Sequence, residues 1–124
     1  MIVDLPMPYI GKRLSVNHYM GKNKYGAMFI YPEVVQWMQA LTASANYHLR
    51  NSKVKLPPTI HLSGIFKNKR SMIDLSNGHK IISDALEQSL GINDREFRFV
   101  DEGYTIDKSK LPMLIIGIEV EDAI

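Results

Sequence analysis

Apolar residues in this chain change their spacing several times, and these changes constrain the fold more than any other feature. Alternation at every second position, typical of a half-buried strand, runs over 60–66 and again over 114–120. Helical spacing runs over 32–50, where Pro32 can open the helix, and over 76–90, where Ser76 or Asn77 can cap it and Gly91 can end it. With short strands at 2–5 and 97–107, the order predicts an α+β domain: a mixed β-sheet with two main helices packed on it. The last two strands can form a hairpin, and a bulge is expected near Gly103.

Length and composition exclude several classes of protein. The chain has 124 residues, 45% of them hydrophobic, and we interpret 1–124 as one domain without an internal linker. The absence of cysteine excludes a disulfide scaffold, a thiolate zinc site and a cysteine nucleophile. No apolar run approaches the ~20 residues of a membrane span, and the first residues do not resemble a signal peptide. We therefore expect a cytoplasmic protein without a membrane partner.

Charge is unevenly distributed along the chain. Residues 1–80 contain eleven Lys or Arg and only three acids, whereas residues 81–124 contain four basic residues and ten acids. This asymmetry favours a basic face for a polyanion and a separate acidic region, although folding could also intermix the charges. The segment 10–31 combines lysines with tyrosines around a turn at 21–24 and predicts a basic hairpin or long loop. Tyr19 and Tyr25 in this segment either stack on exposed bases or pack the hairpin against the body.

Two short segments carry the residues best suited to chemistry. In 69–80, a basic turn is followed by Asp74, a helix start and Lys80. Amides at a helix start attract phosphate, and a carboxylate beside them can hold a hard cation. In 91–97, Asp94 opens a strand after a tight loop, and it could approach Asp74 if that strand lies beside the strand ending near Phe66. The alternative is that both aspartates are ordinary turn residues and Lys80 is a solvated side chain.

These segments resemble the RusA-type Holliday junction resolvases of bacteria, prophages and phages. The family signature is an Asp-Leu-Asp-Asn motif, a nearby lysine, an Asp-Ala-Leu helix, a glycine and a further aspartate that opens a strand. The start of the chain, with Leu5-Pro6-x-Pro8 and Ser15-x-Asn17-His18-Tyr19, also resembles the family, so that the likeness covers most of the sequence. The matching positions of the signature are Asp74-Leu75-Ser76-Asn77, Lys80, Asp84-Ala85-Leu86, Gly91 and Asp94.

The resemblance implies a homodimeric endonuclease that resolves four-way DNA junctions by paired nicks, in recombination, repair or phage DNA processing. It implies a Mg²⁺-dependent site, with Mn²⁺ as a possible substitute. Asp74 and Asp94 would be metal ligands, and Lys80 would lie beside the scissile phosphate.

Ser76 departs from the family pattern, because it stands where the family has its second aspartate. Three interpretations remain open. Ser76 could bind the metal weakly or through water, leaving a weaker enzyme, or Asp84 or Glu96 could compensate. Alternatively, the protein binds junctions with weak or no cleavage. Asp84 follows Lys80 by four residues, and a pair on the helix surface is the favoured interpretation of these two.

Basic residues near the two motifs are the expected DNA contacts. A third possible function, a protein-interaction module that never meets DNA, would leave Asp74 and Asp94 as chance turn residues. The residues predicted to contact DNA are Lys12, Arg13, Lys67, Lys69 and Arg70.

Overall fold

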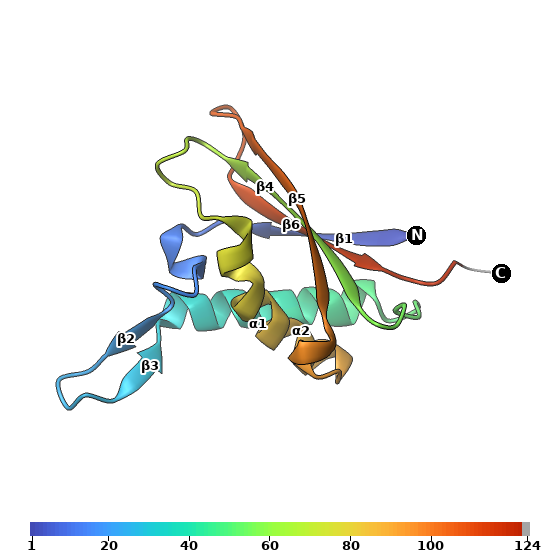
Figure 1. Ribbon diagram of the computed structural model, residues 1–124, viewed down its shortest axis with the longest axis horizontal. Helices are drawn as coiled ribbons and strands as arrows, with labels where there is room; N and C mark the ends of the chain where they lie inside the picture. Colours follow the sequence, from blue (N-terminus) through green and yellow to red (C-terminus); the bar gives the residue numbers. More distant parts are fainter. Residues whose placement is uncertain (123–124) are drawn as a thin grey trace.

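The computed structural model describes residues 1–122, which form an α+β fold with one four-stranded mixed sheet, a small hairpin and two helices (Figure 1). Three short 3₁₀ turns, η1 to η3, complete the structure. The elements in chain order are β1 Ile2–Pro8, η1 Lys12–Leu14, β2 Met20–Lys22, β3 Met28–Ile30, α1 Pro32–His48, β4 Thr59–Phe66, η2 Leu75–Gly78, α2 His79–Leu90, η3 Asp94–Glu96, β5 Arg98–Ile106 and β6 Met113–Glu119.

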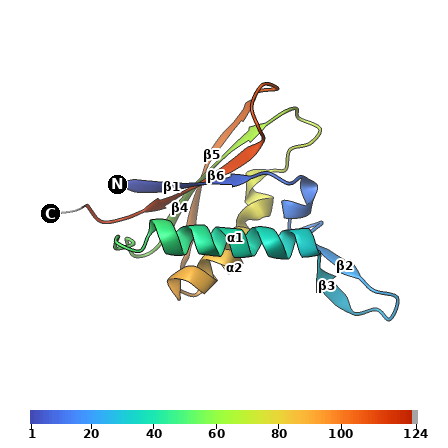
Figure 2. The ribbon, with the colours of Figure 1, turned by 180° about the vertical axis from the view of Figure 1, so that it is seen from behind.

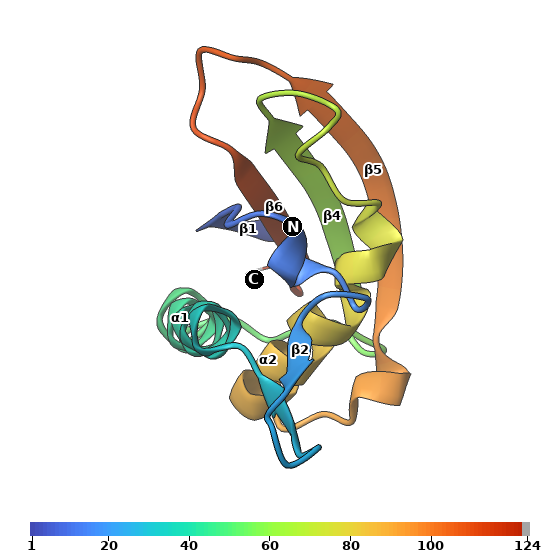
Figure 3. The ribbon, with the colours of Figure 1, turned by 90° about the vertical axis from the view of Figure 1, so that its left-hand side faces the viewer.

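Both helices cover the same face of the sheet, as Figure 3 shows. The strand order is β1-β6-β4-β5, and the predicted alternation in β4 places Ile60, Leu62 and Phe66 in the core between sheet and helices. Helix α1 is fixed to the end of β1 by Trp37, whose Nε1–H donates to the Pro8 carbonyl at 2.6 Å. It is fixed to α2 by Thr42, whose hydroxyl donates to the Ala85 carbonyl at 2.8 Å.

The expected hairpin between the last two strands is wrong. β5 pairs in parallel with β4, whereas β6 lies between β1 and β4 and is antiparallel to both. Composition explains the arrangement, because apolar residues occupy consecutive positions in β6 and suit a central strand, whereas β5 is largely polar and exposed and suits an edge. Between them, residues 107–112 cross the end of β4, where the Asp107 N–H donates to the Phe66 carbonyl.

The second helix begins slightly later than the sequence predicted. The 3₁₀ turn η2 comes first and α2 starts at His79, because the Asn77 N–H bonds to the Asp74 carbonyl and closes a tighter turn. The predicted end is confirmed: Gly91 adopts a left-handed conformation with φ of 67°. The bulge near Gly103 is also confirmed, since the β4–β5 register shifts there.

The segment 10–31 contains the expected hairpin, β2–β3, which extends away from the sheet and helices in Figures 1 and 2. Across residues 1–122, none of the helices has the length and apolar character needed to cross a membrane.

Candidate functional site

Lys80 lies at the centre of the candidate site, at the start of α2. Its Nζ donates to Asp84 Oδ1 at 3.0 Å and lies 3.6 Å from Asp94 Oδ2. Asp84 is one turn further along the same helix, so their pairing follows from helix geometry. Asp94 is fourteen residues away in sequence, and its contact with Lys80 depends on the tertiary fold.

The turn after α2 brings Asp94 back beside the helix. Gly91 reverses the chain, and its N–H donates to the Glu87 carbonyl. Asn93 caps η3 by accepting the Arg95 N–H, and the Glu87 side chain accepts the Asp94 N–H at 3.1 Å. Glu87 therefore holds the backbone of Asp94 alongside α2, which leaves the Asp94 carboxylate near Lys80.

The surroundings of Lys80 favour its charged form. The hydrogen bond to Asp84 raises the pKa of Lys80, and the charges of Asp84 and Asp94 and the nearby Tyr19 hydroxyl raise it further. Lys80 nevertheless stays largely exposed to solvent, with 47% of its side chain accessible. The site thus offers a protonated amine that an incoming phosphate can reach.

Asp74 lies in a separate hollow of about 230 Å³ at the start of η2. Its carboxylate is exposed and, among the residues that the structure describes, takes part in no ion pair and no side-chain hydrogen bond. The hollow brings one lysine, one histidine and several polar groups around this carboxylate. Its other lining residues are Lys12, Ser15, Asn17, His18, Met72, Ile73 and Asn77.

The segment 12–19 joins this hollow to the surroundings of Lys80. The Val16 N–H donates to the Asn77 carbonyl at 2.7 Å, which attaches the segment to η2. On one side it supplies Lys12 and His18 to the hollow of Asp74, and on the other it brings Tyr19 near Lys80. The family-like start of the chain therefore borders both of the predicted chemical segments.

The structure brings Asp94 to Lys80 but gives no contact between Asp94 and Asp74. The strand after Asp94 does lie beside β4, as that hypothesis required, but the pairing is parallel. Thr59 pairs with Arg98, so Asp94 lies near the start of β4, whereas Asp74 follows the loop that leaves its end. Within residues 1–122, His, Asp and Glu side chains form no group of three that could hold a metal ion. The convergence of Asp74 and Asp94 on one cation stays a prediction.

The residues considered as substitutes for a missing carboxylate differ in their contacts. The favoured interpretation of Asp84, a surface pair with Lys80, is confirmed. Ser76 is exposed in η2, and its carbonyl accepts the His79 N–H. Glu96 is exposed in η3, where its N–H donates to the Asn93 carbonyl.

The predicted DNA contacts fall into two groups. Lys67, Lys69 and Arg70 are exposed in the loop between β4 and η2, while Lys12 is exposed beside the Asp74 hollow. Arg13 is also exposed but is held by its neighbours: its guanidinium lies 3.5 Å from the Tyr31 ring centroid, and its Nε lies 3.7 Å from Glu33. We therefore infer that Arg13 also fixes the root of the hairpin.

The sequence suggested a supporting or phosphate-contact role for His79 but did not predict its contacts with β5, and the positioning role of Glu87 was missed. The His79 ring stacks on Phe99 at 3.9 Å, and its Nε2 lies 2.7 Å from Asp101 Oδ1, which joins the start of α2 to β5. This contact depends on the parallel β4–β5 pairing, which the sequence did not predict. Glu87 could have been found from its place one turn before Gly91, facing the chain reversal.

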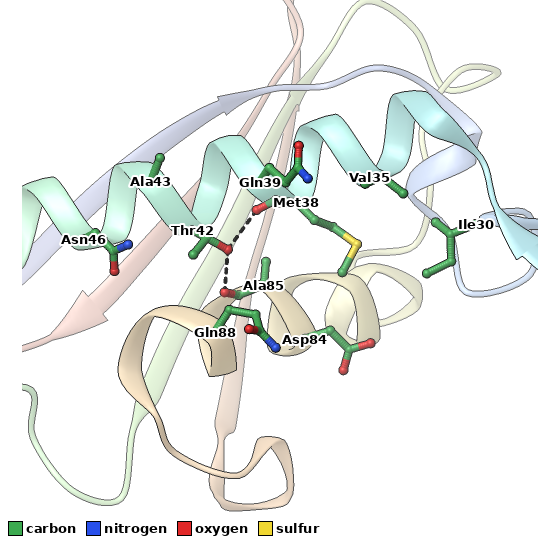
Figure 4. A pocket seen from close by; sticks show the side chains of 10 residues that line it. All are labelled: Ile30, Val35, Met38, Gln39, Thr42, Ala43, Asn46, Asp84, Ala85 and Gln88. Carbon is green, nitrogen blue, oxygen red and sulfur yellow. Dashed lines mark hydrogen bonds between the residues drawn. The ribbon is translucent and has the colours of Figure 1, made fainter.

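A larger hollow of about 450 Å³ lies between the two helices and is mostly apolar (Figure 4). Asp84 is the only titratable residue among those that line it. This hollow therefore offers fewer groups for acid-base chemistry or metal binding than the surroundings of Lys80 and Asp74.

Comparison with protein-family models gives no match to this sequence, and comparison with curated proteins gives none either.

Proposed function

We propose that this protein is a metal-dependent endonuclease of the RusA type, which nicks four-way DNA junctions as a homodimer in the cytoplasm. The observation that supports the proposal most is the 3.6 Å contact between Lys80 and Asp94. The family pattern assigns both residues to one site, although fourteen positions separate them. The family pattern predicts this contact, whereas in a protein-interaction module it would be an ordinary surface ion pair.

The candidates to hold a hard cation are two carboxylates, between which the structure gives no contact. Asp74 and Asp94 offer carboxylate oxygens, which Mg²⁺ and Mn²⁺ prefer, and the Asp74 carboxylate is free of ion pairs among the described residues. A bound cation supplies an activated water molecule and stabilises negative charge on the departing oxygen. Asp74 and Asp94 would hold this cation, with Ser76 contributing weakly or through water.

The protein's own side chains then have separate tasks. The Lys80 ammonium stabilises negative charge on the attacked phosphate, because it is protonated and accessible. Asp84 and Glu87 are positioning residues: Asp84 orients the amine, and Glu87 holds the Asp94 backbone. Lys12 and His18 line the Asp74 hollow, where they can approach the DNA backbone.

A second candidate function is junction binding with weak or no cleavage. It is favoured by Ser76 in place of a carboxylate and by the lack, in the described part of the chain, of three clustered ligand side chains. Both functions use the same basic surface. They differ in whether the phosphodiester bond is cut, and a nicking assay separates them.

The test is strand nicking of a synthetic four-way junction in Mg²⁺, with a linear duplex of the same sequences as the matched substrate. We expect nicks at symmetric positions of the junction, dependence on the cation and little cutting of the duplex. Binding without nicks in either Mg²⁺ or Mn²⁺ would support the second function. No binding to either DNA would contradict both functions.

A further inference from the structure

The β2–β3 hairpin carries a basic and aromatic tip, to which the proposed nuclease site gives no role. The hairpin extends from the N-terminal end of α1, away from the sheet (Figures 1 and 2). At its tip, Tyr25 is 82% exposed, so the packing of this residue against the body is excluded. Tyr19, in contrast, is half-buried and packs against the core.

The tip is held in a defined conformation. The Asn23 side chain accepts the N–H groups of Tyr25 at 2.9 Å and Ala27 at 3.0 Å. Gly26 has a positive φ of 83°, which completes the turn. Since the turn is already ordered, placing the Tyr25 ring against a ligand costs little backbone entropy.

The root of the hairpin is held to the body by aromatic contacts. The Tyr31 N–H donates to the Tyr19 carbonyl, and the Arg13 guanidinium covers the Tyr31 ring. Phe29 packs edge-on against Tyr31 at 5.3 Å, and Gly21 leaves room for these rings, because a Cβ there would lie 2.8 Å from Phe29. The hairpin is therefore an arm with a fixed base.

The positive charge of the arm favours a nucleic acid as its partner. Residues 20–30, which form the arm, contain two lysines and no acid. Lys22 ends β2 and Lys24 directly precedes Tyr25 in the turn, where Lys24 Nζ lies 5.1 Å from the Tyr25 ring centroid. An exposed ring beside a lysine suits a base and its neighbouring phosphate, whereas the cores of protein interfaces are depleted in lysine.

We propose that the hairpin tip binds unpaired or unstacked nucleotides of branched DNA, with Tyr25 stacked on a base and Lys22 and Lys24 against adjacent phosphates. The choice of branched DNA rests on the proposed function. The arm gives the protein a means of distinguishing a junction from linear duplex, because stacked bases inside a duplex offer no face to Tyr25.

The experiment measures fluorescence anisotropy on a four-way junction, a single strand and a linear duplex. Tyr25→Ala is expected to weaken binding to the junction and the single strand about tenfold and to leave duplex binding within about twofold. Tyr25→Phe, which keeps the ring, should bind like the wild type. Tyr47→Ala is the matched control, since Tyr47 is also exposed beside a cation, Arg50, near the other end of α1.

The outcomes separate this inference from the proposed function. If Tyr25→Ala binds each of the three DNAs as tightly as the wild type does, the inference is overturned, even if the wild type nicks junctions. Tyr25-dependent binding by a protein that never nicks would support the inference and contradict the nuclease. A Tyr25→Ala variant that changes only self-association, measured by sedimentation, would overturn the inference in favour of a contact between copies of the chain.

Discussion

At the scale of single residues, Lys80 makes one contact that its sequence spacing predicts and one that depends on the tertiary fold. Its pairing with Asp84 follows from i,i+4 spacing and was expected from the sequence. Its contact with Asp94 requires the reversal at Gly91 and the Glu87 hydrogen bond, which spacing alone does not specify. Substitutions at Asp84 and Asp94 should therefore have different consequences.

Asp84→Asn is expected to lower the pKa of Lys80, because it replaces a charged hydrogen-bond acceptor by a neutral one and removes a neighbouring negative charge. The raised pKa in the folded protein means that this interaction adds stability below the ordinary lysine pKa of 10.5 and loses it as pH rises through the folded value. A titration of the Lys80 side chain by NMR should show a lower midpoint in the variant. Nicking at pH 8 should persist, since Lys80 remains protonated; an unchanged midpoint would contradict the contact.

Ser76→Asp is expected to lower the Mg²⁺ concentration needed for nicking, because it adds a hard oxygen ligand two residues after Asp74. It should also reduce stability without metal, through repulsion between the two carboxylates. A Mg²⁺ titration of both proteins on one junction measures the effect, with Ser76→Asn as a neutral control of similar size. Equal midpoints and rates would place Ser76 outside the coordination shell.

At the scale of elements, the loop between β4 and η2 is anchored by Tyr9. Its hydroxyl donates to the Ser71 carbonyl at 2.5 Å, and its ring packs edge-on against Phe66. Burial raises the pKa of Tyr9 to about 12. This anchor fixes the end of the loop that carries Lys69 and Arg70.

Tyr9→Phe should destabilise the protein by about 1 kcal/mol at neutral pH, through loss of one hydrogen bond. Because the pKa of Tyr9 is raised from 10.0 to about 12 by folding, wild-type stability should fall as pH rises across that window. The variant should lose less stability there. Urea unfolding at pH 7, 10 and 11.5 measures both effects, and parallel pH profiles for the two proteins would contradict the buried hydroxyl.

Much of the fold could be predicted from local sequence patterns. The main wrong prediction, a hairpin of β5 and β6, concerned which strands pair, and this depends on residues far apart in the sequence. The period of α1, the alternation in β4 and the left-handed stop at Gly91 all depend on neighbouring residues. Strand partners do not, so the sequence allowed a β5–β6 hairpin where the fold places β6 at the centre and β5 at the edge. The parallel pairing of β4 with β5 brings Phe99 under the His79 ring and places Asp94 near the start of β4. This part of the site could not be predicted, because the sequence did not specify that pairing.

At the scale of the whole molecule, the charge asymmetry of the sequence is partly intermixed by folding, since Lys53 pairs with Glu121 and Lys80 with Asp84 and Asp94. The basic loop 67–70, Lys12 and the hairpin all belong to the basic part of the chain, whereas the edge strand β5 carries acids such as Asp101 and Glu102. Under the proposed function, the exposed lysines of these three segments are the candidate phosphate contacts. The binding of DNA should therefore depend on salt.

The double variant Lys69→Ala/Arg70→Ala should bind junctions less tightly and with a shallower dependence on salt. Losing two phosphate contacts should reduce the slope of log affinity against log salt by up to about 1.8. Lys53→Ala/Lys55→Ala, which removes two lysines between α1 and β4, is the matched control and should keep the wild-type slope. An unchanged slope in the Lys69/Arg70 variant would place the DNA surface elsewhere.

The most direct test of the proposed nuclease site is whether Asp74 and Asp94 act as one unit. The measurement is the rate of junction nicking in saturating Mg²⁺ by the wild type, Asp74→Asn, Asp94→Asn and the double variant, with junction affinity measured in parallel. If the two carboxylates share one cation, each single substitution lowers the rate by a factor on the order of 10³, the double substitution lowers it little further, and binding is retained. Wild-type rates in either single variant, or independent losses that multiply in the double variant, would contradict a shared metal site.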